Sequence, residues 1–242
     1  MPRRSAVVLT LLCTAALLFS ACGGGGGAAP PETINPNVRD QLAADVAVVQ
    51  VTDLPDTFAS KSATDSDSVS SDEAGQASPE VDKCMRAVAG VDQDTLSNGR
   101  TATAKRVFNN GVRQELITVE GRVEMYKDAT LPKQQMAGLA QPAVSACIKK
   151  VFVDVFTRTN ANVDRIAVRT QKIDGVGDES AGFVVSGPAT TAEGVEVAFG
   201  GEFHVARVGR VLVWTYLFSL QVTPDHTLAV STIKAMAHRV QQ

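Results

Sequence analysis

Arg210-Val211-Leu212-Val213-Trp214-Thr215-Tyr216-Leu217-Phe218 is a stretch in which most side chains are apolar. Successive residues of a β-strand point to opposite faces of a sheet, so the apolar residues divide into two sets. One set holds Val211, Val213 and Leu217, and the other holds Leu212, Trp214, Tyr216 and Phe218. Because both sets are apolar, the stretch predicts a central strand that is covered on both faces.

Further patterns extend from this stretch in both directions. Extended patterns predict strands within residues 101–127, 163–173, 181–186 and 194–207, the first range holding two strands or one with a bulge near Gly121. Helical spacing predicts a short helix from Glu80, a main helix over 131–159 that Pro142 kinks or divides, and a last helix over 227–240. This order indicates an α+β domain with an antiparallel β-sheet of about five to six strands, covered by helices on one side.

The first 21 residues have the three parts of an export signal. Arg3 and Arg4 form a positive region, an apolar run follows to Phe19, and Ser20-Ala21 supply the small residues of a cleavage site. The run is shorter than the roughly 20 residues of a transmembrane helix, so we expect its removal. Phe19-Ser20-Ala21-Cys22 resembles the lipobox of bacterial lipoproteins, which implies a lipid on Cys22, typically including palmitate. The alternatives are an ordinary secretory signal with Cys22 as a free thiol, and twin-arginine export.

Composition divides the rest of the chain into four segments. Residues 22–37 form a flexible Gly/Ala/Pro leash, 38–59 a short apolar segment packing on the domain, 60–79 a Ser/Asp-rich disordered linker, and 80–242 the α+β domain. Without the signal, the chain has 21 basic and 26 acidic side chains, or a charge of about −5. No basic patch is visible, so we expect no nucleic-acid partner.

Two cysteines remain for the exported domain. Cys13 leaves with the signal and Cys22 is used for lipidation, so Cys84 and Cys147 form one pair in an oxidising compartment. We expect a disulfide that closes a loop of about 60 residues and stabilises the fold by roughly 4 kcal/mol. Two buried thiols are the alternative.

Few residues are suited to catalysis. The histidines are His204 within a strand pattern, His226 before the last helix and His238 near its end, and we expect structural or solvated roles for them. No metalloprotease, nucleophile-elbow, Cys-x-x-Cys or phosphate-loop motif is present, so we expect no enzyme, catalytic residue, cofactor or metal.

Two further groups of residues are candidates for binding. The carboxylates Asp174, Asp178 and Glu179 offer oxygen ligands for calcium, but we expect a solvated turn instead. The aromatic residues Trp214, Tyr216 and Phe218 are candidate ligand-facing residues of an apolar pocket, or they pack against helices in the core.

Three short phrases resemble the PknH-like extracellular domain and related actinobacterial lipoproteins. Asp53-Leu54-Pro55-Asp56-Thr57-Phe58 resembles their Asp-Leu-Pro-x-Gly-aromatic phrase, with Thr57 replacing the glycine. Gly175-Val176-Gly177-Asp178-Glu179-Ser180 resembles their Gly-Asp-Glu-small turn, and Arg207-Val208-Gly209-Arg210 resembles their last hairpin. Two rather than four domain cysteines depart from that family. The resemblance implies a sensor-like domain and carries over no catalytic residue.

Together these features predict a lipoprotein anchored at the cell membrane, on its extracytoplasmic face. The expected function is non-enzymatic binding of a ligand or envelope protein by a sensor-like domain. One alternative is a carrier of lipid or another apolar ligand, and another is a purely structural envelope protein.

Overall fold

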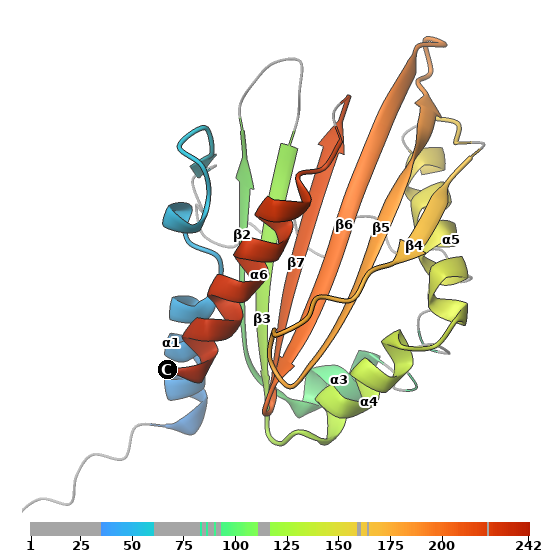
Figure 1. The fold of residues 1–242 in the computed structure, drawn as a ribbon. Helices are drawn as coiled ribbons and strands as arrows, with labels where there is room; N and C mark the ends of the chain where they lie inside the picture. The colour runs from blue at the N-terminus through green and yellow to red at the C-terminus, as the bar shows by residue number, and fades with distance from the viewer. Residues whose placement is uncertain are drawn as a thin grey trace, which may run out of the picture. The chain divides into compact units, whose positions relative to one another are not determined.

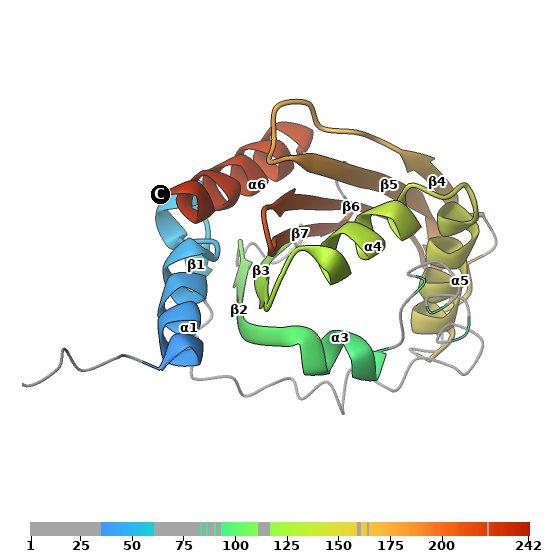
Figure 2. The ribbon, with the colours of Figure 1, turned by 90° about the horizontal axis from the view of Figure 1, so that it is seen from below.

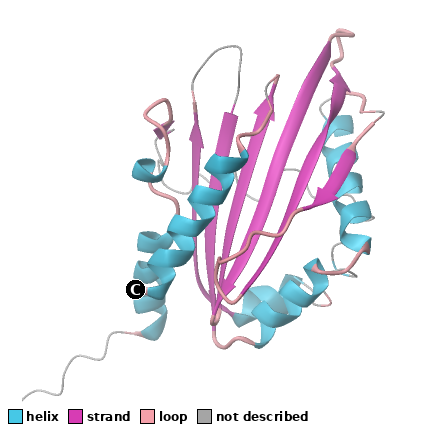
Figure 3. Ribbon diagram, in the orientation of Figure 1, coloured by secondary structure: helices cyan, strands magenta, loops and turns pink. Residues whose placement is uncertain are grey.

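The structure, a computed structural model, describes residues 35–60, 83, 86, 90, 93–110, 117–158, 161–163, 165–221 and 223–242. Residues 34–242 form one compact unit. Figures 1 and 3 show its elements: α1 (Pro36–Ala47), the short 3₁₀ helix η1 (Val51–Asp53), β1 (Ala59–Ser60), α3 (Gln93–Gly99), β2 (Arg100–Asn109), β3 (Ile117–Tyr126), α4 (Thr130–Leu139), α5 (Ala143–Arg158), β4 (Ala167–Thr170), β5 (Glu179–Thr190), β6 (Glu196–Val208), β7 (Val211–Leu220) and α6 (His226–Gln241).

The strands form one antiparallel sheet in the order β1-β2-β3-β7-β6-β5-β4. The central position predicted for residues 210–218 is confirmed, because β7 lies between β3 and β6. Its Trp214 is opposite Arg122 on one side and Val205 on the other. The predicted α+β class with an antiparallel sheet is therefore confirmed.

Helices lie on both faces of the sheet rather than on one (Figure 2). On the first face, α1 and α6 pack over a core that includes Val213 of β7 and Met236 of α6. On the second face, α3 and α4 pack over Leu212 and Tyr126, and α5 lies over β4 and β5. The expected one-sided cover is corrected here, since it would have left the aromatic side of β7 exposed to water.

Local sequence signals explain three helix boundaries: the end of α4, the start of α5 and the start of α6. The main helix is divided as expected, with α4 ending at Leu139 and α5 beginning at Ala143, on either side of Pro142. Asp225 caps α6, since its carboxylate accepts hydrogen bonds from the backbone N–H groups of Thr227 and Leu228 at 2.9 and 3.3 Å.

The N-terminal helix α1 was not expected from the sequence. Its buried face carries Asp40, Ala44 and Ala47, whereas the larger apolar side chains of Leu42 and Val46 are exposed to solvent. The positions of the large apolar residues therefore do not identify the buried face of this helix. Asn35 caps the helix, and Pro36 occupies its first turn. Proline is tolerated there because a backbone N–H in the first turn has no partner within the helix. Residues 48–58 then pack against the sheet and α6, as Val49, Leu54 and Phe58 are buried in the same core.

Several expectations fall outside the described residues. These are the signal, Cys22, the leash up to residue 34, the linker from residue 61, and most of the helix from Glu80, including Cys84. Within the described part of the chain, no helix is long and apolar enough to cross a membrane.

Candidate functional site

A cavity of about 360 Å³ lies between the second face of the sheet and helices α3, α4 and α5. The strands contribute Arg100, Glu120, Arg122, Glu124, Ala181, Phe183, Phe203, His204, Val205, Trp214, Thr215 and Tyr216. The helices contribute Leu96, Gln135, Leu139, Val144, Ile148, Val151 and Phe152, and Arg86 completes the described lining. The cavity therefore has a mostly apolar wall with charged groups in one part.

The positions of the helices explain why this space exists. Helix α5 contacts β4 and β5, whereas α4 contacts β5 and β6 and packs over Tyr126 and Leu212 at the ends of β3 and β7. The cavity lies over the neighbouring part of β3 and β7. Aromatic rings line the resulting gap. The rings of Phe203 and Tyr216 lie 4.4 Å apart, and Phe152 of α5 meets Phe203 edge-on at 5.9 Å. Such rings offer flat apolar surface to a ligand.

A buried carboxylate organises the charged part of the cavity. Glu124 accepts hydrogen bonds from Trp214 Nε1 at 3.2 Å and from the Tyr126 hydroxyl at 3.1 Å, and Arg100 pairs with it at 2.8 Å. Arg122 lies 3.4 Å from a carboxylate oxygen of Glu120 and 3.8 Å from one of Glu124. The wall thus offers both signs of charge beside the indole of Trp214.

Tyr216 adds a neutral polar group to this wall. Burial raises the pKa of its hydroxyl above the ordinary value, and the negative charge of Glu120 raises it further. The hydroxyl therefore stays protonated at neutral pH and can donate a hydrogen bond.

Two of the three aromatic residues singled out from the sequence line this cavity. Trp214 and Tyr216 are part of its wall, whereas Phe218 is not and stacks on Tyr216 with ring centres 6.2 Å apart. Alternation along a strand does not distinguish them, because all three occupy the same set of positions. Their contact with a ligand stays a prediction.

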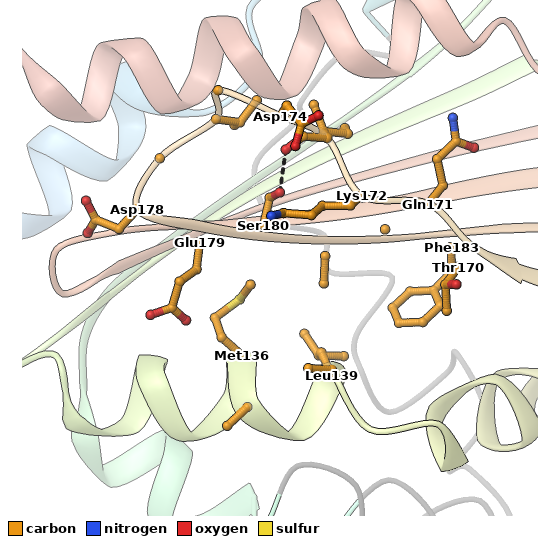
Figure 4. Close-up of a pocket in the computed structure, with 18 of the residues that line it drawn as sticks. Met136, Leu139, Thr170, Gln171, Lys172, Asp174, Asp178, Glu179, Ser180 and Phe183 are labelled. Carbon is orange, nitrogen blue, oxygen red and sulfur yellow. Dashed lines mark hydrogen bonds between the residues drawn. The ribbon is translucent and has the colours of Figure 1, made fainter.

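A second, wider hollow of about 690 Å³ lies between α4 and residues 170–183 (Figure 4). In this view Asp174 lies apart from Asp178 and Glu179. Asp178 and Glu179 each pair with Arg207 at 2.9 Å, and Asp178 also accepts the backbone N–H of Gly209 at 2.8 Å. The three carboxylates do not converge on one point, so the arrangement does not favour the calcium interpretation.

A polar cluster lies on the first face of the sheet, beneath the start of α6. Glu202 Oε2 lies 3.0 Å from His204 Nε2 and 2.8 Å from His226 Nδ1. The Gln171 amide nitrogen lies 2.9 Å from His226 Nε2. Burial raises the pKa of Glu202, but its hydrogen bonds to the two histidines outweigh that effect, so the pKa is below its ordinary value.

This cluster was missed because each histidine was considered separately. His204 has the structural hydrogen bond that was expected, but His226 is bonded to Glu202 rather than merely solvated. The signal was the Glu202-Phe203-His204 spacing, which places a carboxylate and an imidazole on one face of a strand.

The residues predicted for lipidation and cross-linking are only partly described. Cys147 is buried on α5, packed with Val144 and Phe183. Cys22 and Cys84 lie outside the described residues.

Comparisons with known proteins give a single distant likeness to report. No family model matches the chain, and no curated protein matches it in sequence. The chain resembles the crystal structure of the extracellular domain of PknH from Mycobacterium tuberculosis at 12% sequence identity, over 62% of this chain and 71% of that chain, with a TM-score of 0.36.

Proposed function

We propose that the chain is a lipid-anchored extracytoplasmic protein whose domain binds a small, partly apolar ligand without catalysing a reaction on it. The observation that carries the proposal is the cavity between the sheet and α3–α5. Its volume of about 360 Å³ falls within the range of roughly 300–1,000 Å³ that small-molecule sites occupy. Apolar walls with a few placed polar groups are also typical of such sites.

The two parts of the wall suggest the chemistry of the ligand. The rings of Phe152, Phe203 and Tyr216 suit an apolar or aromatic body. The pairs formed by Arg100 and Arg122 with glutamates suit a polar or charged end, because each partner can turn toward a ligand group. A compact amphipathic molecule satisfies both.

Anchoring rests on the N-terminal sequence. Acylation of Cys22 would attach two or more acyl chains to one residue, and two chains give stable membrane binding where one is marginal. The glycines from Gly23 to Gly27 would then separate the domain from the membrane surface.

A disulfide between Cys84 and Cys147 is part of the proposal. Cys147 is carried by α5, which also supplies Ile148, Val151 and Phe152 to the cavity. A covalent link between α5 and the segment that precedes α3 would restrict the movement of α5 relative to that segment.

The non-enzymatic part of the proposal is supported by the chemistry of the lining. The described lining residues include no serine or cysteine that could act as a nucleophile, and their one histidine, His204, is hydrogen-bonded to Glu202.

The apolar rings also support the second candidate, a carrier of lipid or another apolar ligand. A carrier differs in releasing its ligand to membranes.

Trp214 provides a direct test, because it is the only tryptophan of the chain and lines the cavity. The probe is 1-anilinonaphthalene-8-sulfonate, whose apolar rings and sulfonate match the two parts of the wall. We expect saturable quenching of Trp214 emission with matching energy transfer to the probe.

Two variants on α5 form a matched pair. Val151 lines the cavity, whereas Val153 is 38% exposed and is not among the lining residues. Val151→Phe should weaken probe binding at least about 10-fold by filling the cavity, and Val153→Phe should leave it unchanged. Unchanged binding in Val151→Phe, with native circular dichroism, would contradict the proposal, as would absence of saturable quenching in the parent.

Intact-mass analysis separates the two candidate functions. Native spectra of the purified protein should show a bound mass that denaturation removes if the chain is a carrier loaded with lipid. A bare mass together with probe binding supports the reversible binding domain instead.

A further inference from the structure

The cluster of Glu202, His204 and His226 brings three metal-binding atom types to one place. One ligand atom from each residue, two imidazole nitrogens and a carboxylate oxygen, lies within 4.8 Å of the other two. Glu202 and His204 are alternate residues of β6 and therefore share a face, and His226 is the first residue of α6. The cluster lies on the sheet face that α6 covers, opposite to the aromatic rings of the ligand cavity, although His204 also borders that cavity.

The charge balance of Glu202 differs from that of the other buried ionic groups in the described chain. Asp40 pairs with Arg210 at 2.7 Å, Glu124 with Arg100 at 2.8 Å, and Arg207 with Asp178 and Glu179 at 2.9 Å. Glu202 is only 4% exposed, yet its ion-pair partners among the described residues are two imidazoles. These partners include no lysine or arginine, and imidazole is a side chain that commonly binds transition metals.

We propose that Glu202 Oε2, His204 Nε2 and His226 Nδ1 bind a divalent transition-metal ion of the zinc type. Two imidazoles and one carboxylate suit zinc and its neighbours, while magnesium and calcium prefer oxygen ligands alone. Three protein ligands leave a fourth position open to another ligand.

Two of the three distances between ligand atoms need only a small adjustment to hold such an ion, and the third, between the two imidazoles, is within 4.8 Å. Ligand atoms about 2.0–2.1 Å from a tetrahedral zinc ion lie about 3.3 Å from one another, against 2.8 and 3.0 Å for the present hydrogen bonds. The side chain of His226 is 48% exposed, so it can shift by this amount, and the ion can enter beside it.

The second ring nitrogen of His204 does not oppose this assignment. Nδ1 is buried and has no hydrogen-bond partner among the described residues. It lacks a partner whichever ring nitrogen carries the proton, so a metal at Nε2 creates no additional unsatisfied atom there. Metal binding replaces the hydrogen bonds to Glu202 with bonds to the ion, and each imidazole then carries its proton on the ring nitrogen that does not bind the ion.

The decisive measurement is a zinc titration of the full-length protein, purified in detergent without a histidine tag and stripped of metal with a chelator. Competition with a chromophoric chelator should show one equivalent of Zn²⁺ bound. Co²⁺ should bind at the same place and give the visible absorption of a tetrahedral complex, which reports the ligand geometry independently of affinity.

Two histidines of α6 provide the variant and its control. His226→Ala removes a proposed ligand at a half-exposed position, whereas His238→Ala removes an exposed histidine from the last turn of the same helix. We expect His226→Ala to weaken Zn²⁺ binding at least about 10-fold and to abolish the cobalt spectrum, and His238→Ala to bind as the parent does.

Glu202→Gln tests the carboxylate with little change of shape and should weaken binding similarly. His226→Ala is the deciding variant, since its exposed position makes misfolding no explanation for a loss. Parent-like binding by His226→Ala, an equal loss in His238→Ala, or no stoichiometric binding by the parent would each overturn the proposal.

Discussion

Arg210 and Asp40 form a two-pronged ion pair across 170 residues of sequence, with Nη2 to Oδ1 at 2.7 Å and Nη1 to Oδ2 at 2.8 Å. Asp40 also accepts a hydrogen bond from the Thr101 hydroxyl at 2.6 Å. Arg210 lies in the turn between β6 and β7, and Asp40 lies on the buried face of α1. The pair thus joins the N-terminal helix to the central hairpin of the sheet.

This pair predicts a loss of stability in acid. The hydrogen bonds from Arg210, the largest cause, lower the pKa of Asp40 from 3.8 to about 2 despite its burial. Because the folded-state pKa is below the unfolded one, the contribution is complete above about pH 5 and is lost as the pH falls toward 2. It amounts to up to about 2 kcal/mol.

Urea unfolding of the parent and of Asp40→Asn, at about pH 6 and about pH 2.5, measures this contribution. The free energy of unfolding should differ by up to about 2 kcal/mol at the higher pH, and the two proteins should converge in acid. Asp56→Asn, at an exposed position, should follow the parent at both pH values. Parallel pH profiles for the parent and Asp40→Asn would contradict the prediction.

Gly121 of β3 leaves space for the N-terminal segment. A Cβ added there would lie 2.5 Å from Val49 Cγ1, 2.7 Å from Val49 Cβ and 3.0 Å from Met236 Sδ. Gly121→Ala should therefore lower the free energy of unfolding by roughly 1–3 kcal/mol through overpacking. Gly201→Ala is the matched control, since the nearest atoms to its added Cβ are 3.6 Å away. Equal urea midpoints for the two variants would show that residues 48–58 do not pack firmly here.

Lipidation of Cys22 predicts membrane association. Cys22→Ala removes the thiol that carries the lipid, and Cys13→Ala changes a cysteine within the expected signal. We expect Cys22→Ala to leave the membrane fraction and Cys13→Ala to remain in it, as measured by fractionation and by intact mass. The lipoprotein assignment fails if Cys22→Ala still sediments with membranes.

The proposed disulfide predicts a mass difference and a stability difference. Under denaturing conditions the unreduced protein should be two daltons lighter than the reduced one, because disulfide formation removes two hydrogens. The double variant Cys84→Ser with Cys147→Ser should lower the free energy of unfolding by about 2–5 kcal/mol. A reduced mass obtained from the untreated exported protein would show two thiols instead.

Elements whose signals are local could be predicted from the sequence. Apolar residues in both alternating sets identified β7 as a covered strand, Pro142 marked the division between α4 and α5, and Asp225 marked the start of α6. These signals are readable because a strand, a proline break and a helix cap each depend on residues a few positions apart.

Features that depend on residues far apart in the chain are seen only in the folded protein. The sequence did not predict the packing of α1, because the partners of its buried Asp40 are Arg210 and Thr101, far along the chain. Glu202 and His204 meet His226 only because α6 folds back over β6. The cavity likewise depends on where α5 lies on the sheet, which Trp214 and Tyr216 cannot specify. Pairing between distant side chains depends on the whole fold, so it cannot be predicted from local periodicity.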